Sequence, residues 1–369
     1  MKIAICGDVS ITKEASENFE RKDEKAAFGG VLDYFSQCDN VIINLECALT
    51  DSENAIKKFG PNLKATKNAA ETFKKAGVTE CALSNNHIFD YGIEGVEDTI
   101  KELDKVGIKW TGFGKNYEDS RKNYFIEKDG LSIGIVNVCE HEYTYATENR
   151  MGARPFDEFE TMDDIRNAKK SADYVIVIYH GGKEHCRYPS PRLMKACREM
   201  VRCGADAVLC QHSHIIGCYE KFENAHILYG QGNFHFVKYL DNKEWAQGLM
   251  VELEITKEKI DIEYIPVVAG DTGINLAEGE EREQILAAFW ERSETLHNGE
   301  WKNRWHAFCE KMYNQYKKAI CGYDAEDDAV KTQQFAHYLD CEAHTDVWRE
   351  IFPTWNQTNE LDKGNIRLR

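Results

Sequence analysis

The sequence has no long apolar run and no apolar leader at its start. None of its segments approaches the about 18 consecutive apolar residues that a membrane-spanning helix needs. The opening MKIAIC reaches a glycine after six residues, which is too short for the apolar centre of a signal peptide. We therefore expect a cytoplasmic protein without a membrane segment.

Positive charge is scarce relative to negative charge. The chain has 46 lysines and arginines against 63 acidic residues, a net charge of −17. Phosphate backbones are bound mainly by lysine and arginine, so this balance argues against a nucleic-acid partner.

The 13 cysteines are odd in number and include no two CxxC pairs at zinc-ribbon spacing. Many of them, such as Cys6, Cys81 and Cys210, sit inside apolar runs. This pattern predicts reduced, buried thiols in a reducing compartment. Cys197 and Cys203 lie within or beside a helical pattern and are expected in the core, because a reactive thiolate needs an open, electropositive setting.

Short β-branched runs alternate with helical patterns through residues 1–270. The helical patterns IEGVEDTIKELDKVG and PSPRLMKACREMVRCG both end in glycine, a common helix stop. The buried strands are predicted at KIAIC, NVIINL, ECALS, LSIGIVNV, YVIVIY and ADAVLC. This alternation predicts an α/β fold, with GLMVELEIT and KIDIEYIPVV as a closing antiparallel hairpin.

The pattern of apolar and polar residues changes after residue 275. Residues 280–352 show helical patterns without a convincing strand, and five of the seven tryptophans lie from Trp290 to Trp355. We predict one domain over residues 1–275 and a helical C-terminal region with a polar tail over residues 276–369. That region would cover the sheet domain, shape a substrate cleft or mediate dimerisation, and the oligomeric state stays open.

A polar donor follows each of several predicted strands. Because ligands of α/β sheets bind beyond the carboxyl ends of the strands, these side chains can meet at one edge. The candidate metal ligands are Asp8, Glu46, Asn86, His180, His212 and His214. Taken singly, each has an ordinary reading as a turn residue or a hydrogen-bonded surface residue, and their shared position at strand ends favours a metal site.

The donor types indicate which metals would fit. Imidazole, carboxylate and amide oxygen together suit Mn, Fe or Zn, whereas Ca prefers an all-oxygen shell. Six candidate donors exceed what one four-coordinate zinc needs. We therefore expect one or two divalent ions, and two ions about 3.5–4 Å apart would share a bridging carboxylate.

The motifs GDV, NLE, SNNHIFDYG, HGGKE, QHSH and YGQGNF, in this order, resemble the capsule poly-γ-glutamate biosynthesis (CapA) family. This family is a branch of the calcineurin-like metallophosphoesterase superfamily. The resemblance covers residues 1–270 and implies a metallophosphatase-like, four-layer α/β/β/α sandwich, so the helical region becomes a C-terminal appendage.

The resemblance also implies roles for individual residues. Asp8 and His214 would bind one ion, and Glu46 would bridge to a second ion. That second ion would be bound by Asn86, His180 and His212. One departure concerns Ser10: the wider superfamily begins D-x-H, and this chain has Asp8-Val9-Ser10, so the first ion loses a ligand.

Two further residues would serve proton transfer and three would contact substrate. His87 matches the general acid of the superfamily, and Asp90 would orient its imidazole. The candidate substrate contacts are Lys64, in FGPNLKAT, and Glu184 and Arg187, together with Lys183 and His185, on the loop after His180. A solvated loop is the alternative interpretation for these contacts.

Three functions remain open. The first is metal-dependent hydrolysis or transfer on a phosphoester or γ-glutamyl substrate, an anionic small molecule or a polyglutamate-like chain. The second is cleavage of γ-glutamyl amides by the same ions. The third is a non-catalytic scaffold that binds an anionic polymer or a synthase through a degenerate metal site.

Overall fold

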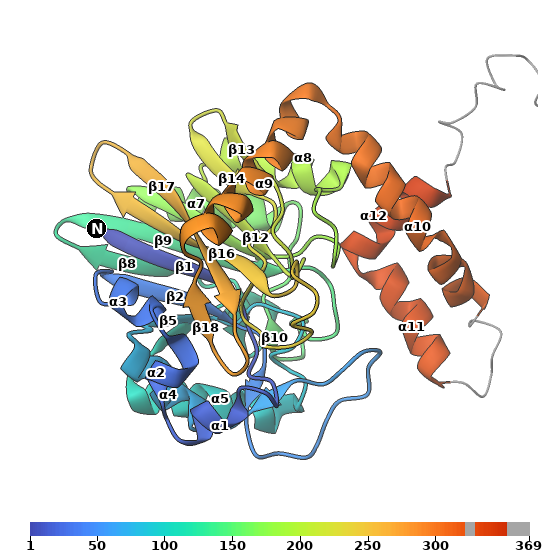
Figure 1. Cartoon of the computed structure of the whole chain (residues 1–369). Helices are drawn as coiled ribbons and strands as arrows, with labels where there is room; N and C mark the ends of the chain where they lie inside the picture. Colours follow the sequence, from blue (N-terminus) through green and yellow to red (C-terminus); the bar gives the residue numbers. More distant parts are fainter. Residues whose placement is uncertain (322–328, 353–369) are drawn as a thin grey trace, which may run out of the picture.

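The computed structural model describes residues 1–321 and 329–352 and contains two large β-sheets (Figure 1). The strands of the first sheet are β1 (Lys2–Val9), β2 (Asn40–Leu45), β5 (Glu80–Ala82), β6 (Lys109–Thr111), β15 (Asn233–His235), β16 (Gln247–Ile255), β17 (Ile260–Ala269) and β18 (Ile274–Leu276). Their order is β18-β17-β16-β1-β2-β5-β6, and β15 pairs with β1. The predicted hairpin is present as β16 and β17.

The second sheet has six strands in the order β13-β14-β12-β11-β9-β8. These strands are β8 (Tyr124–Lys128), β9 (Leu131–Cys139), β11 (Tyr174–His180), β12 (Ala207–Gln211), β13 (Tyr219–Phe222) and β14 (Ala225–Leu228). Two small ladders join β3 (Ala48–Leu49) to β4 (Lys64–Ala65) and β7 (Phe113–Gly114) to β10 (Gly152–Ala153).

The central strands of both sheets run parallel. Strands β1, β2, β5 and β6 pair in parallel in the first sheet, and β9, β11, β12 and β14 do so in the second. Their residues are buried on both faces, as expected for parallel strands covered on both sides. The carboxyl ends of each set therefore gather at one edge of its sheet.

Helices cover the outer faces of the two sheets. Those of the α/β part are α1 (Ser16–Glu20), α2 (Glu24–Phe28), α3 (Val31–Phe35), α4 (Ala69–Ala76), α5 (Gly92–Val106), α6 (Tyr117–Ser120), α7 (Glu160–Ser171) and α8 (Pro191–Arg202). Both predicted long helices begin and end as their sequences indicate: Ser190 caps α8 with Pro191 at its first position, and Gly107 ends α5 in the left-handed conformation.

Three apolar clusters define the layers. The first lies between the first sheet and α1–α5, the second between the sheets, and the third between the second sheet and α7 and α8. The succession is helix, sheet, sheet, helix, so the α/β/β/α sandwich is confirmed. No helix among the described residues is both long enough and apolar enough to cross a bilayer.

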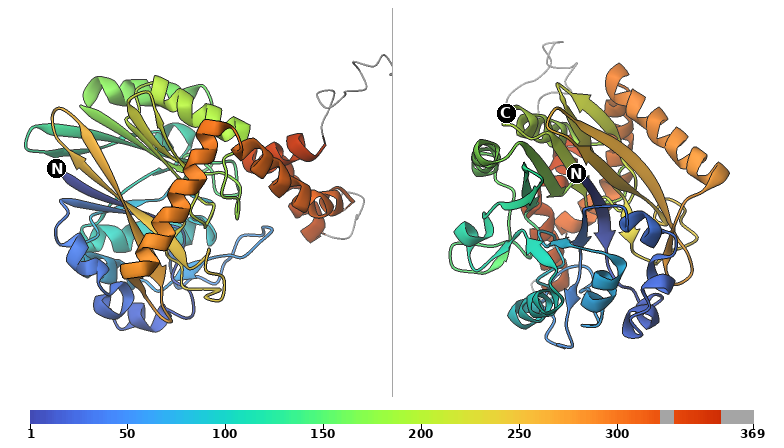
Figure 2. Two further views of the ribbon diagram at one scale, coloured as in Figure 1. Left: turned by 45° about the horizontal axis from the view of Figure 1, so that its top comes forward. Right: turned by 90° about the vertical axis from the view of Figure 1, so that its left-hand side faces the viewer.

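Four helices follow the last strand: α9 (Gly279–Asn298), α10 (Trp301–Cys321), α11 (Ala329–Asp340) and α12 (Glu342–Ile351). Figure 2 shows α9 lying along the side of the sandwich and α10–α12 extending beyond its end. Trp301 and Trp305 are buried in the cluster that also covers the second sheet, so the appendage shares that core. Trp355 and the predicted polar tail lie outside the described residues.

Candidate metal centre

Glu46 lies at the centre of a cluster of imidazoles. It follows β2 directly, and ligand atoms of Glu46, His212 and His214 all lie within 4.8 Å of one another. The Nε2 atom of His180 is 3.4 Å from Glu46 Oε1, and the Nε2 atom of His214 is 4.0 Å from it. All four side chains are buried. The structure thus brings together residues from β2, β11 and the loop after β12.

The carboxylate of Glu46 has the environment that a metal ligand needs. Both its oxygens are buried, and neither receives a hydrogen bond from the described part of the chain. A buried carboxylate without donors is costly, because nothing replaces the water that it loses. A divalent cation would satisfy both oxygens, and the surrounding imidazoles would complete a nitrogen and oxygen set that suits Mn, Fe or Zn. The residues present therefore fit a metal ion.

The pKa values of the cluster are displaced in a way that a cation would relieve. Burial and the carboxylate of Asp8 raise the pKa of Glu46 to about 8. Burial lowers the pKa of His180 to about 4 and that of His212 to about 3. These imidazoles are neutral at pH 7, which is the form that binds metal, and a cation would favour the ionised form of Glu46.

The backbone of the HxH motif is held in an uncommon conformation. His212 has a φ of 75° and His214 a φ of 55°, both in the left-handed region that non-glycine residues seldom occupy. Such strain persists where surrounding structure fixes it, commonly at functional sites. Here it turns both imidazoles toward Glu46.

Asp8 and two asparagines brace the same cluster. Asp8 Oδ2 lies 3.4 Å from His214 Nδ1 and accepts a hydrogen bond from the backbone N–H of His212. Asn44 donates from its Nδ2 to the other oxygen of Asp8 at 2.7 Å. The predicted ligand Asn86 places its Oδ1 3.0 Å from His180 Nε2. The six predicted ligands therefore lie together, and their role as ligands stays a prediction.

His87 and Asp90 form a buried pair beside this cluster. The Nδ1 of His87 lies 2.6 Å from Asp90 Oδ2, which leaves the Nε2 of the imidazole for another partner. The ammonium of Lys58 lies 2.5 Å from the second oxygen of Asp90 and 3.0 Å from His87 Nδ1. The side chain of Lys58 is 2% exposed. Sequence reasoning missed Lys58, although it lies six residues before the residue chosen instead.

The predicted substrate contacts occupy different surroundings. Lys64 pairs with Glu53 at 2.6 Å and donates to the carbonyl of Ser52, and both of these partners lie outside the cluster. Arg187 is engaged in a partly exposed ion pair with Glu244. Neither Lys64 nor Arg187 is therefore placed with the imidazoles of the candidate centre.

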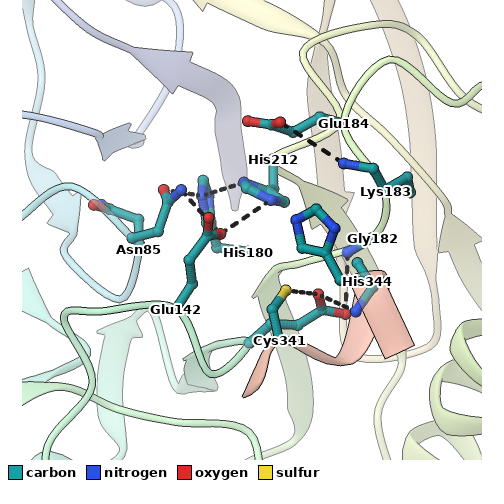
Figure 3. A network of polar contacts seen from close by, with 12 residues as sticks. Asn85, Glu142, His180, Gly182, Lys183, Glu184, His212, Cys341 and His344 are labelled. Carbon is teal, nitrogen blue, oxygen red and sulfur yellow. Dashed lines mark hydrogen bonds and ion pairs between the residues drawn. The ribbon is translucent and has the colours of Figure 1, made fainter. Parts of the chain in front are cut away.

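The loop after His180 does reach the cluster with another predicted residue. Glu184 Oε1 lies 4.0 Å from the Nε2 of His214. Its Oε2 lies 3.8 Å from the Nζ of Lys183 (Figure 3). The imidazole of His185 lies near Trp245, with ring centroids 5.8 Å apart, and its centroid is 6.4 Å from that of His214. Glu184, Lys183 and His185 therefore belong to the part of this loop that approaches the candidate centre.

Glu142 connects the cluster to the C-terminal helices and was also missed. Its Oε2 accepts a hydrogen bond from Asn86 Nδ2 at 3.0 Å and lies 3.3 Å from His212 Nε2 (Figure 3). Its Oε1 lies 3.3 Å from the Nε2 of His337 in α11. Burial and the nearby carboxylate of Glu184 raise the pKa of Glu142 to about 8. Glu142 is the third residue after the end of β9, and this position in the sequence did not mark it as a candidate site residue.

The fold and the polar edge define an α/β/β/α sandwich whose strand ends converge on a candidate metal site. Residues 2–238 match the family described as bacterial capsule synthesis protein PGA_cap. This span exceeds half of the chain, so the chain belongs to that family, and the resemblance seen in its motifs is confirmed.

Similar proteins from three bacteria support membership of the same family. The chain is 28% identical over 246 residues to the capsule biosynthesis protein CapA of Bacillus anthracis, covering 64% of this chain and 60% of that protein. It is 29% identical over 243 residues to the PGA biosynthesis protein CapA of Bacillus subtilis, covering 64% and 63%. A probable polyglutamine synthesis accessory protein of Mycobacterium tuberculosis is 28% identical over 210 residues, covering 53% and 55%. The chain thus spans less than two thirds of the length of these relatives.

Solved structures show weak likeness. A hypothetical protein of Thermus thermophilus superposes with a TM-score of 0.46 at 17% identity, covering 72% of this chain and 98% of that chain. A putative 5'-nucleotidase of Staphylococcus aureus, in complex with alpha-ketoglutarate, superposes with a TM-score of 0.44 at 13% identity, covering 78% and 58%. Likenesses at this level do not bear on the site.

Proposed function

We propose that this chain is a metal-dependent hydrolase or transferase of the capsule synthesis family, acting on a phosphoester or γ-glutamyl bond. The observation that carries the proposal is Glu46, a buried carboxylate without a hydrogen-bond donor, surrounded by the imidazoles of His180, His212 and His214. In its ionised form, such a buried and unpaired carboxylate destabilises the folded state, and a bound cation would remove this cost.

The proposed ligands are the six residues gathered at the strand ends, and the proposed metal is Mn, Fe or Zn. They are Asp8, Glu46, Asn86, His180, His212 and His214. A bound divalent ion would polarise the scissile P=O or C=O and make a water more acidic. One ion is favoured directly by the Glu46 cluster, and a second ion would use Asp8.

The residues of the chain itself would deliver a proton to the leaving group. His87 is oriented by its 2.6 Å contact with Asp90, so its Nε2 can present a proton to a leaving oxygen or nitrogen. The ammonium of Lys58 holds the other oxygen of Asp90, which prevents that carboxylate from rotating away. We assign His87 as the general acid and Asp90 and Lys58 as its positioning residues.

The substrate class follows from the relatives. The Bacillus relatives are named for capsule and PGA biosynthesis, and the Mycobacterium relative for polyglutamine synthesis. We therefore propose an anionic, glutamyl-containing or phosphorylated partner for this chain, with Glu184 and Lys183 on the loop that meets it.

The experiment combines metal content with turnover. Purified protein is loaded with Mn²⁺, its metal content is measured by mass spectrometry, and it is assayed on a phosphodiester, a phosphomonoester and γ-glutamyl peptides. We expect turnover of one class and a loss of about 100-fold or more in His87→Ala with metal content unchanged. Turnover that survives His87→Ala would contradict the assignment of the general acid.

One observation favours a non-catalytic accessory role as the second candidate. Ser10 stands where the wider superfamily has a metal-binding histidine, so the ion beside Asp8 has one ligand fewer. Full metal loading without turnover on any of the three substrate classes would support this candidate and exclude the enzyme.

A further inference from the structure

The C-terminal helices are anchored to the edge of the sandwich at the candidate metal centre. Glu140, the residue after β9, accepts hydrogen bonds from the backbone N–H of Ala343 at 3.1 Å and from Cys341 Sγ at 3.5 Å. Glu342 accepts a hydrogen bond from the backbone N–H of His141 at 2.8 Å. The first turn of α12 is therefore fastened to the segment that leads into Glu142.

A buried ion network holds α12 from its other side. The guanidinium of Arg192, at the start of α8, lies 2.7 Å from Glu140 Oε1 and 2.9 Å from Asp346 Oδ2. Asp346 also accepts a hydrogen bond from the hydroxyl of Ser190 at 2.5 Å. These contacts fix the orientation of α12, and with it the side chains of its first turn.

His344 is the side chain that α12 brings to the centre. It is 6% exposed, and its Nδ1 lies 2.5 Å from the hydroxyl of Tyr316. The hydroxyl of Tyr316 can donate to Nδ1, and with that bond formed the hydrogen of the neutral imidazole sits on Nε2. Among the described residues no hydrogen bond is formed by Nε2, so this nitrogen is left for a ligand. Figure 3 shows this imidazole between His212 and the loop of Lys183.

Lys183 is a second donor, and its ammonium forms no hydrogen bond with the described residues. Its side chain is 7% exposed, and its nearest ion-pair partner is Glu184 at 3.8 Å, which is beyond hydrogen-bond distance. The charge of Lys183 is close enough to His344 that, after burial itself, it is the largest influence lowering the pKa of that imidazole. A neutral N–H donor and an ammonium thus lie together beside His212.

We propose that His344 and Lys183 form a carboxylate-binding subsite beside the candidate metal centre. The proposal rests on the proposed function and adds to it that the substrate carries a carboxylate distant from the reacting bond. The helix that supplies His344 lies outside residues 2–238, so a segment beyond the family match completes the site.

The charge of the subsite favours a carboxylate over a phosphate. His344 is neutral near pH 7 because burial holds its pKa well below the usual range, which leaves the single charge of Lys183. The carboxylate of Glu184 lies 3.8 Å from Lys183 and would repel a dianion more strongly than a monoanion. A carboxylate can accept from both donors with one negative charge, whereas a phosphate monoester carries about −1.5 to −2.

The test compares a short monocarboxylate with a dicarboxylate on the Mn²⁺-loaded full chain. Acetate can occupy the metal alone, whereas glutarate can also place its second carboxylate at the subsite. By titration calorimetry we expect glutarate to bind more tightly than acetate. We expect His344→Ala and Lys183→Met each to weaken glutarate by about 10-fold, since each removes a charge-assisted or buried hydrogen bond, with acetate unchanged.

His306→Ala is the matched control, because His306 belongs to the same helical region and pairs with Glu350 away from the centre. Equal affinity for acetate and glutarate in the unaltered protein would overturn the subsite, and so would unchanged glutarate affinity in both folded variants. If His344→Ala fails to fold, Lys183→Met on its loop decides. An equal loss of inorganic phosphate affinity would overturn the preference for carboxylate.

Metal content, measured on the same samples, separates the subsite proposal from the proposed function on which it rests. A protein that takes up no Mn²⁺, yet loses glutarate binding in both variants, contradicts the proposed function and supports the subsite. A protein that takes up Mn²⁺ and turns over substrate, but treats acetate and glutarate alike in every variant, supports the function and contradicts the subsite.

Discussion

Glu46 and Glu140 occupy equivalent places in the two sheets and have opposite environments. Each is the first residue after a parallel strand, Glu46 after β2 and Glu140 after β9, and each is at most 1% exposed. Glu140 is paired with Arg192 and accepts hydrogen bonds from the backbone of Gly182 and Ala343. Glu46 accepts none.

The difference separates a structural carboxylate from a candidate ligand. A buried carboxylate that is fully paired stabilises the elements that pair with it, and here Glu140 joins β9, α8 and α12. A buried carboxylate that is left unpaired destabilises the folded chain until a cation arrives. Position at a strand end does not decide between these roles, whereas the set of hydrogen-bond donors around the oxygens does.

The largest expected effect comes from removing the structural carboxylate. Glu140→Ala leaves Arg192 with Asp346 as its remaining buried partner and frees the first turn of α12. We expect a loss of about 3–5 kcal/mol in the free energy of unfolding, measured by chemical denaturation, because a buried charge pair is broken. Limited proteolysis should cut the C-terminal helices first.

Glu244→Ala is the control for that change, since Glu244 belongs to an exposed pair with Arg187. It should cost no more than about 1 kcal/mol. Equal stability losses in Glu140→Ala and Glu244→Ala would mean that Glu140 does not anchor α12.

Removing the unpaired carboxylate should affect metal instead of stability. Glu46→Gln keeps the volume of the side chain and removes the charge that a divalent ion needs. We expect the affinity for Mn²⁺ to fall by more than about 100-fold, beyond the range seen when only a supporting partner of a ligand is lost. The metal-free variant should unfold at the same or a higher temperature than the unaltered protein. Metal binding of normal affinity would remove Glu46 from the set of ligands.

The pH dependence of metal-free stability gives a third contrast. The pKa of Glu46 is raised from an ordinary value near 4.5 to about 8, so the folded state holds a proton that the unfolded state releases. The stability that this proton contributes is present below pH 4.5 and is lost as the pH rises toward 8. Replacing Glu46 by glutamine should therefore reduce the downward slope of stability between pH 5 and 8 by roughly 1 kcal/mol per pH unit. Denaturation of both metal-free proteins across this range measures it, and parallel curves would contradict it.

Much of the fold could be predicted because its signals are local. Runs such as YVIVIY and NVIINL are apolar on both faces, and this matches the burial of β11 and β2 between layers. The ends of two helices were readable from Gly107 and Gly204 for the same reason, whereas the cap at Ser190 was not predicted. Placement of the donors at strand ends followed from the parallel order of the strands alone.

The parts of the site that escaped prediction depend on long-range packing. Lys58 and Lys64 stand in the same stretch, and only the path of the folded loop decides which ammonium meets Asp90. Glu142 and His337 are 195 residues apart in the chain, and their contact arises from the docking of α11. Hydrophobic periodicity and short motifs carry no information about such contacts, since they describe only residues that are close together in the sequence.

The smallest expected effect tests that choice between two lysines. Lys58→Met removes the ammonium that contacts both Asp90 and His87, so the imidazole loses a fixed orientation. We expect kcat on the accepted substrate to fall by about 10-fold, less than the about 100-fold expected when the general acid itself is removed. Metal content should not change. Lys64→Met, which breaks the Lys64–Glu53 ion pair in which Glu53 is 88% exposed, should alter kcat less than twofold. If both variants lose activity equally, the buried contact of Lys58 with Asp90 has no special part in proton delivery, and the position of His87 must be secured by Asp90 and the backbone of its own turn.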